Sequence, residues 1–165
     1  MGGRLVDEKI GASLNVPGAT YEDNYIVGAG IQRFIYRVGP LLLGYEAGAA
    51  ARFGEGTTAE LWSGTVGRLN DIRLLDNLYV APQMTVGLSY VTAAQPGREL
   101  TLQESKPGRD AHLLFYLGPG LDFKTSPTSR YTLFWRLHHR SGAGETLGSM
   151  RGATNANVIG LKIDF

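Results

Sequence analysis

The chain contains no cysteine among its 165 residues, and its charges almost cancel, with a formal net charge of +1. A disulfide framework, a thiol nucleophile and a Cys-ligated metal site are therefore excluded. The low net charge argues against a nucleic acid as the main partner. No apolar run approaches the roughly 18 residues of a membrane-spanning helix. No apolar leader follows Met1, and we expect the chain to be the mature form of an exported protein.

Glycine is plentiful, at 23 residues, and it separates short segments in which apolar and polar side chains alternate. Alternation with a period of two predicts β-strands. We expect one domain over residues 1–165. Its eight strands are expected at about 4–14, 24–37, 41–53, 58–67, 78–92, 110–124, 130–141 and 154–165. Pro- and Gly-containing turns lie between them.

The last of these segments alternates most strictly. One face carries Asn155, Asn157, Ile159, Leu161, Ile163 and Phe165, and the other face carries small or polar residues. A strand of about ten residues that is apolar on one side is typical of a transmembrane β-barrel. An aromatic residue at the last position also resembles the C-terminal signature of bacterial outer-membrane barrels.

Alternation alone does not say which face points outward, because a soluble lipid-carrying barrel of lipocalin type buries its apolar face. Here the polar face is rich in glycine, alanine and serine and has few of the lysines and glutamates of a soluble surface. Such a face suits the crowded lumen of an eight-stranded barrel. Long segments at 15–23, 93–109 and 142–153 alternate with short turns at 38–40 and 125–129, which is the bacterial pattern. We therefore predict an eight-stranded antiparallel transmembrane β-barrel in the bacterial outer membrane.

The candidate chemistry lies at the end of the seventh predicted strand. His139 and Ser141 share the apolar face of this strand, two residues apart. A serine hydroxyl becomes a nucleophile when a neighbouring base takes its proton, and histidine is the usual base. The following hairpin should bring Asn155 beside His139, where it could orient the imidazole as the third member of a triad.

His-x-Ser at the end of the penultimate strand, followed by a loop, a strand and a terminal aromatic, resembles the PagL family of outer-membrane lipid A 3-O-deacylases. The likeness covers about residues 130–165. It implies that His139 is the base and Ser141 the nucleophile of an esterase that removes the 3-linked acyl chain of lipid A. The chain departs from the family pattern twice. Gly142 replaces an asparagine linked to the oxyanion hole, and Asn155 replaces the glutamate of the triad.

Three neighbouring residues are candidates for contact with the substrate: Gly142, Arg140 and Trp135. Arg140 could pair with lipid A phosphates. It also shares the polar face of its strand with Arg136 and His138, and this face favours a lumen network with acidic residues. The candidate acidic partners are Glu46, Asp122 and Asp164. The interpretation of His139 and Ser141 as ordinary polar residues at a membrane rim also stays open.

The remaining aromatic and histidine residues suggest no cofactor. Trp62, Tyr90, Tyr131 and Trp135 are expected on the lipid face. His112, His138 and His139 do not form a metal-binding spacing, and we expect neither metal nor cofactor. The predicted partner is lipid A or lipopolysaccharide, acted on from within the membrane. The alternative is a barrel without enzymatic activity, in a structural or interaction role and with a degenerate site.

Overall fold

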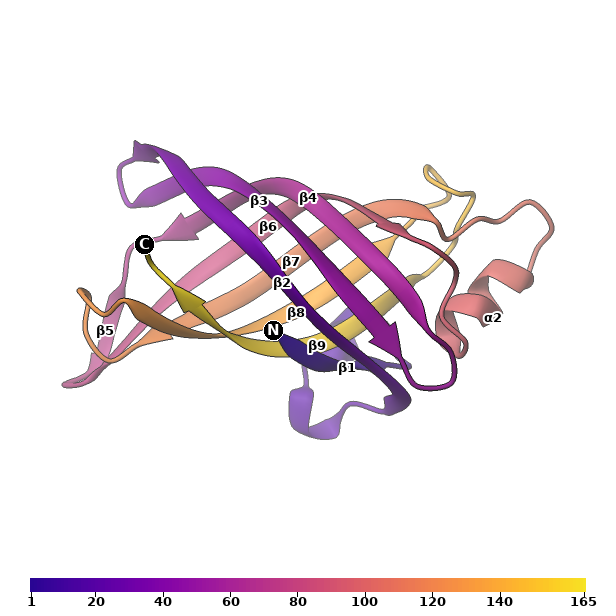
Figure 1. Cartoon of the computed structure of the whole chain (residues 1–165), viewed down its shortest axis with the longest axis horizontal. Coiled ribbons are helices and arrows are strands. Elements are labelled where there is room, and N and C mark those ends of the chain that lie inside the picture. Colours follow the sequence, from indigo (N-terminus) through magenta and orange to yellow (C-terminus); the bar gives the residue numbers. More distant parts are fainter.

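In the computed structural model, which describes all 165 residues, eight antiparallel strands close into a ring (Figure 1). The ring closes through the β1–β9 and β4–β6 pairings, which confirms the predicted eight-stranded barrel. Its strands are β1 (Gly2–Val6), β2 (Tyr21–Val38), β3 (Leu41–Phe53), β4 (Thr58–Leu69), β6 (Leu78–Val91), β7 (Leu113–Lys124), β8 (Tyr131–Ser141) and β9 (Ala153–Ile163). A short extra strand, β5 (Ile72–Leu75), pairs with β6 alone.

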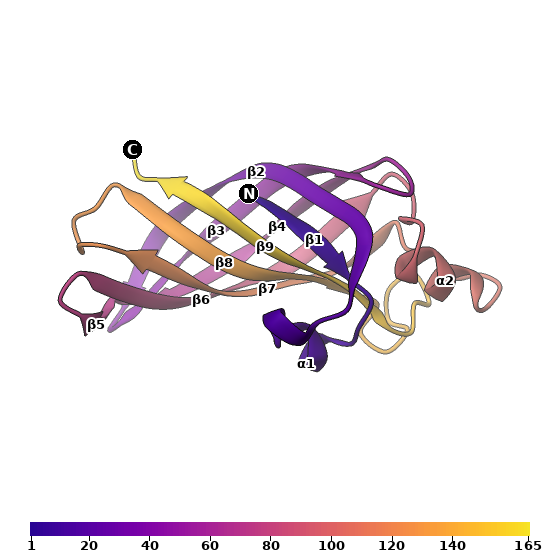
Figure 2. The same cartoon turned by 90° about the horizontal axis from the view of Figure 1, so that it is seen from below.

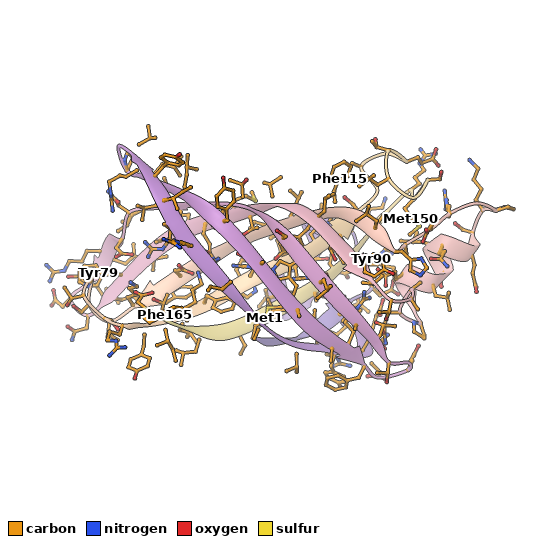
Figure 3. All side chains as sticks on the ribbon, turned by 45° about the horizontal axis from the view of Figure 1, so that its top comes forward. Met1, Tyr79, Tyr90, Phe115, Met150 and Phe165 are labelled. Carbon is orange, nitrogen blue, oxygen red and sulfur yellow. The ribbon has the colours of Figure 1, made fainter.

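The two ends of the barrel differ. At one end, here the loop end, the strands are joined by residues 7–20, 54–57, 92–112 and 142–152. The helices α1 (Ile10–Ser13), η1 (Val16–Gly18) and α2 (Arg98–Glu104) all belong to these connections. None of them is long and apolar enough to cross a membrane. The opposite end, here the turn end, has the connections 39–40, 70–77 and 125–130. Figure 3 shows Tyr90, Phe115 and Met150 toward the loop end and Tyr79 and Phe165 toward the turn end.

The prediction of a first strand over 4–14 was wrong. The strand ends at Val6, and residues 7–20, which we call the first loop, leave the ring and form α1 and η1. In Figure 2, α1 projects from the side of the barrel wall.

The outer face of the wall is apolar and exposed, as a membrane-spanning barrel requires. Exposed side chains on this face come from every long strand. They include Val27, Ile31, Tyr45, Leu61, Val86, Leu88, Leu133, Ile159 and Leu161. Tyr90 and Tyr131 are exposed as well, as predicted. The choice of the apolar face as the outward one is therefore confirmed.

Side chains fill the lumen, and here one prediction fails. Trp62 points inward and is buried, because the alternation of β4 puts Leu61 outside and Trp62 inside. Its indole nitrogen donates to Glu46 Oε1 at 2.8 Å. The ring fits because Gly48 lies opposite it: a Cβ at Gly48 would come within 2.2 Å of the indole. The small residues of the polar face thus make room for large lumen side chains.

Charged groups in the lumen are paired, as expected for the inner face of β8. Arg136 contacts Glu46, and His138 Nε2 lies 2.7 Å from Glu60 Oε1. Asp122 instead accepts hydrogen bonds from Arg68 and Lys162. Asp164 lies outside this network, 3.4 Å from Lys124.

Arg140 belongs to the same interior. It is buried and contacts Glu99 of α2, and Glu99 also accepts a 2.6 Å hydrogen bond from Arg52. Helix α2 therefore closes the lumen at the loop end by placing a carboxylate between two arginines.

Candidate active site on the outer face

His139 and Ser141 lie near the loop end of β8, on the outer face of the wall. The β8–β9 ladder pairs His139 with Asn155 and Ser141 with Ala153. Across the first of these pairs, His139 Nδ1 lies 2.6 Å from Asn155 Oδ1. The contact expected between His139 and Asn155 is therefore present, and it gives the imidazole a fixed neighbour.

A second contact fixes the orientation of the Asn155 amide. Asn155 Nδ2 donates to the backbone carbonyl oxygen of Glu8 at 2.7 Å. Because a carbonyl oxygen only accepts, the amide nitrogen must face Glu8 and the amide oxygen must face His139. That oxygen also only accepts, so Nδ1 of His139 must carry a proton. In the neutral ring, Nε2 is then the unprotonated nitrogen, which is the form that a general base needs.

Ser141 is partly exposed, and its hydroxyl forms no hydrogen bond within the chain. His139 Nε2 is likewise without a partner in the chain, and it is not among the enclosed polar atoms. The two side chains share one face of the strand, with Cα atoms about 6–7 Å apart. Side-chain rotation can bring Oγ to Nε2 over this separation, and catalytic hydrogen bonds often tighten only when substrate binds.

The loop after Ser141, residues 142–152, has an unusual backbone. Three of its residues are the only non-glycine residues of the chain with positive φ: Ala143, Glu145 and Ser149. Such conformations are costly and are found preferentially at functional sites. Gly142 is packed so closely that a Cβ there would lie 2.3 Å from the Met150 carbonyl oxygen. The start of this loop is therefore held in one arrangement by backbone contacts.

This arrangement leaves backbone donors free beside Ser141. The N–H groups of Gly142, Ala143 and Gly144 donate to no acceptor within the chain. Free backbone N–H groups next to a nucleophile are the type of donor that stabilises an oxyanion. Gly142, which replaces an asparagine of the family pattern, keeps this backbone donor although it has no side chain to contribute.

The first loop covers the outer face around His139. Its backbone accepts hydrogen bonds from Asn155 and Asn157. In this region the outward-facing Val6 and Leu137 are buried, and His139 is only 5% and Asn155 only 2% exposed. By contrast, Leu133 and Ile159, farther along the same two strands, are 56% and 61% exposed. The site is thus a covered cluster of polar side chains on an outer face that is otherwise apolar and exposed.

The three candidate substrate-contact residues lie in different places. Gly142 lies beside Ser141, whereas Arg140 is in the lumen and is bound to α2, so it does not reach the outer face. Trp135 is on the outer face, and its Nε1 donates to Asn157 Oδ1 at 3.2 Å. Glu145, a carboxylate in the loop, pairs with Arg109 rather than with His139.

Sequence reasoning missed the contribution of the first loop. Glu8 acts through its backbone carbonyl, and Ser13 does the same for Asn157, whose Nδ2 donates to the Ser13 carbonyl at 3.0 Å. Backbone acceptors leave no mark in the sequence, because every residue type carries the same carbonyl group. No group of three His, Asp or Glu side chains is arranged to hold a metal ion.

Comparison with known proteins agrees with this architecture. No family model matches the chain, and no curated protein matches it. Among solved structures, the chain is similar to a crystal structure of the outer membrane enzyme PagL, with a TM-score of 0.57. The match covers 86% of this chain and 90% of that chain, at 16% sequence identity.

The chain has a PagL-like fold. At this identity the similarity concerns the fold alone. It agrees with the barrel form of the chain and with the apolar outer face, which together point to the outer membrane as its location.

Proposed function

We propose that the protein is an outer-membrane esterase that hydrolyses an ester-linked acyl chain of lipid A in the outer leaflet. Ser141 is the nucleophile, His139 the general base and Asn155 the residue that orients the imidazole. The observation that carries the proposal is the 2.6 Å contact between His139 Nδ1 and Asn155 Oδ1 on the lipid-facing side of the wall. This contact leaves His139 Nε2 as the unprotonated nitrogen that can act as the base. Ser141, whose hydroxyl is free, lies two residues farther along the same strand.

The chemistry follows from this arrangement. His139 Nε2 takes the proton of Ser141 as Oγ attacks the ester carbonyl, and the free N–H groups of residues 142–144 stabilise the oxyanion. The imidazolium then returns the proton to the departing sugar hydroxyl, which leaves an acyl-serine. A water molecule, activated by His139 in the same way, releases the fatty acid. Asn155 holds the ring but supplies no charge to the imidazolium, so we expect a slower reaction than a carboxylate would support.

The substrate class follows from where the site lies. Ser141 is on the outer face near the loop end, with the apolar band below it and the polar connections above it. A lipid whose ester joins an acyl chain to a polar head group would place that bond at this level. The resemblance of residues 130–165 to the deacylase family selects the 3-linked chain of lipid A among such esters.

Mass spectrometry of lipid A from cells that express the protein tests the proposal. We expect loss of one 3-hydroxyacyl chain with the native sequence and no loss with Ser141→Ala, at equal amounts of folded barrel. Lipid A that stays intact with the native protein, or a loss that persists in Ser141→Ala, would exclude this function.

A barrel without enzymatic activity is the second candidate, and one observation favours it. Ser141 Oγ makes no hydrogen bond to His139 in the structure, and the first loop leaves little of His139 exposed. In that case the polar cluster would serve to anchor the first loop to the wall. Intact lipid A with a stable, folded barrel would support this alternative.

A further inference from the structure

Two asparagines of β9 connect the first loop to β8 in the same way. Asn155 donates to the Glu8 carbonyl and accepts from His139 Nδ1. Asn157, two residues along and on the same face, donates to the Ser13 carbonyl and accepts from Trp135 Nε1. Each amide therefore joins a backbone oxygen of the loop to a ring nitrogen of the neighbouring strand.

The amide of each asparagine can take only one orientation in its connection. The loop carbonyls can only accept, so each amide must turn its NH₂ group to the loop and its oxygen to β8. Trp135 Nε1 is always a donor, so the second connection would form in any case. His139 is different, because either of its nitrogens can carry the proton. The Glu8 carbonyl thus selects the His139 tautomer through Asn155.

The first loop is built to stay in place while it does this. Ser13 is fully buried, and its hydroxyl donates to the Lys9 carbonyl at 3.1 Å. In the same loop, Ile10 and Leu14 are 39% and 49% exposed.

We infer that the first loop is a positioning element of the site: the Glu8 backbone carbonyl, acting through Asn155, keeps His139 in the tautomer with the proton on Nδ1. This inference rests on the proposed function for its catalytic consequence. Its structural content, a tautomer set by a loop carbonyl, can be measured independently of any activity.

The loop can be removed without opening the barrel. Asp7 and Thr20 are already joined, since the Asp7 N–H donates to the Thr20 carbonyl at 2.9 Å, so a short Gly-Ser linker can replace residues 8–18. The full chain and this linker variant are compared in detergent micelles. The ¹⁵N shifts of the imidazole nitrogens then report the tautomer of His139, with His112→Gln and His138→Gln spectra providing the assignment.

In the full chain we expect a single His139 tautomer with the proton on Nδ1, and in the linker variant a mixture of both. A matched change at the turn end, a Gly-Ser replacement of residues 126–129, should leave the single tautomer intact. The same tautomer in the full chain and the linker variant would overturn the inference. This result would leave the esterase proposal untouched, because that proposal is decided by the Ser141→Ala comparison.

Asn155→Asp provides the second arm. A carboxylate at this position should orient and charge-stabilise the imidazolium, but it would also put an acceptor against the Glu8 carbonyl. We therefore expect Asn155→Asp to lower kcat at least tenfold in the full chain and to raise it in the linker variant. An equal or higher kcat in the full chain would contradict a role for Glu8.

Discussion

Two parts of the same outer face, both on β8 and β9, differ in what covers them. Toward the turn end, Leu133 and Ile159 are more than half exposed, and their apolar side chains suit contact with lipid. Toward the loop end, His139 and Asn155 are almost fully covered by the first loop. The difference shows how polar side chains are tolerated on a lipid-facing wall: the amides of Asn155 and Asn157 are paired within the protein, because lipid offers no partner.

The largest expected effect is on catalysis, and it should be confined to the covered part. His139→Asn removes the base and should lower the rate of lipid A deacylation by on the order of 10³-fold or more. His112→Asn is the matched control, because His112 lies outside the strands and its imidazole lies against Asp110 and the Tyr90 ring, away from Ser141. The rate is followed by mass spectrometry of lipid A over time. An equal loss in both variants would indicate that the covered part has no special role.

The bare part should be the more sensitive to charge. Ile159→Arg puts a cation against lipid near mid-wall and should lower the free energy of unfolding by about 2–4 kcal/mol. Thr128→Arg, in an exposed turn, should change it by less than about 0.5 kcal/mol. Urea titration of barrels refolded into lipid vesicles measures both values. Equal effects would mean that this part of the wall does not face lipid.

Removal of a polar group should have different effects in the covered part and at a bare position elsewhere on the wall. Asn157→Leu leaves the Ser13 carbonyl and Trp135 Nε1 without their partner and should cost about 1–3 kcal/mol of stability. Ser63→Leu, at an exposed outward position of β4, should be neutral or stabilising, since it adds apolar surface against lipid. The same urea titration distinguishes them. A neutral Asn157→Leu would show that the first loop is not held by these contacts.

The smallest effect concerns the start of the loop after Ser141. Gly142→Ala adds a Cβ that would meet the carbonyl oxygens of Met150 and Leu147 at 2.3 and 2.7 Å. The loop must shift, and we expect kcat to fall about tenfold, about 1.4 kcal/mol in barrier, with little change in KM. Gly67→Ala is the control, because its Cβ would find only ordinary contacts at 3.5 Å. An unchanged kcat would remove these backbone N–H groups from the mechanism.

Much of the barrel could be predicted because alternation depends on the residues of one strand alone. Tyr45, Glu46 and Arg52 of β3 lie on the faces that their order along the chain predicts. The pairing of His139 with Asn155 followed from the length of one hairpin. The prediction for Trp62 was wrong because the alternation of β4, with Leu61 outside, decides its face, whereas aromatic character alone does not.

The covering of the site could not be predicted in this way. Residues 7–20 leave the ring after Val6. Their hydrogen bonds with β9 are accepted by the backbone carbonyls of Glu8 and Ser13, and every residue type carries such a carbonyl. Glu99 is a similar case, because its partners in the lumen are more than 30 residues away along the chain. Contacts of this kind depend on the closed barrel rather than on a local pattern.

The central claim, that the covered polar part of the wall is a serine esterase site, is tested most directly by an active-site-directed fluorophosphonate. The folded barrel is treated in lipid vesicles, digested and mapped by mass spectrometry. The account predicts a single phosphonylated residue, Ser141, with labelling abolished in His139→Asn. No adduct on Ser141, or an adduct that forms equally fast without His139, would contradict it.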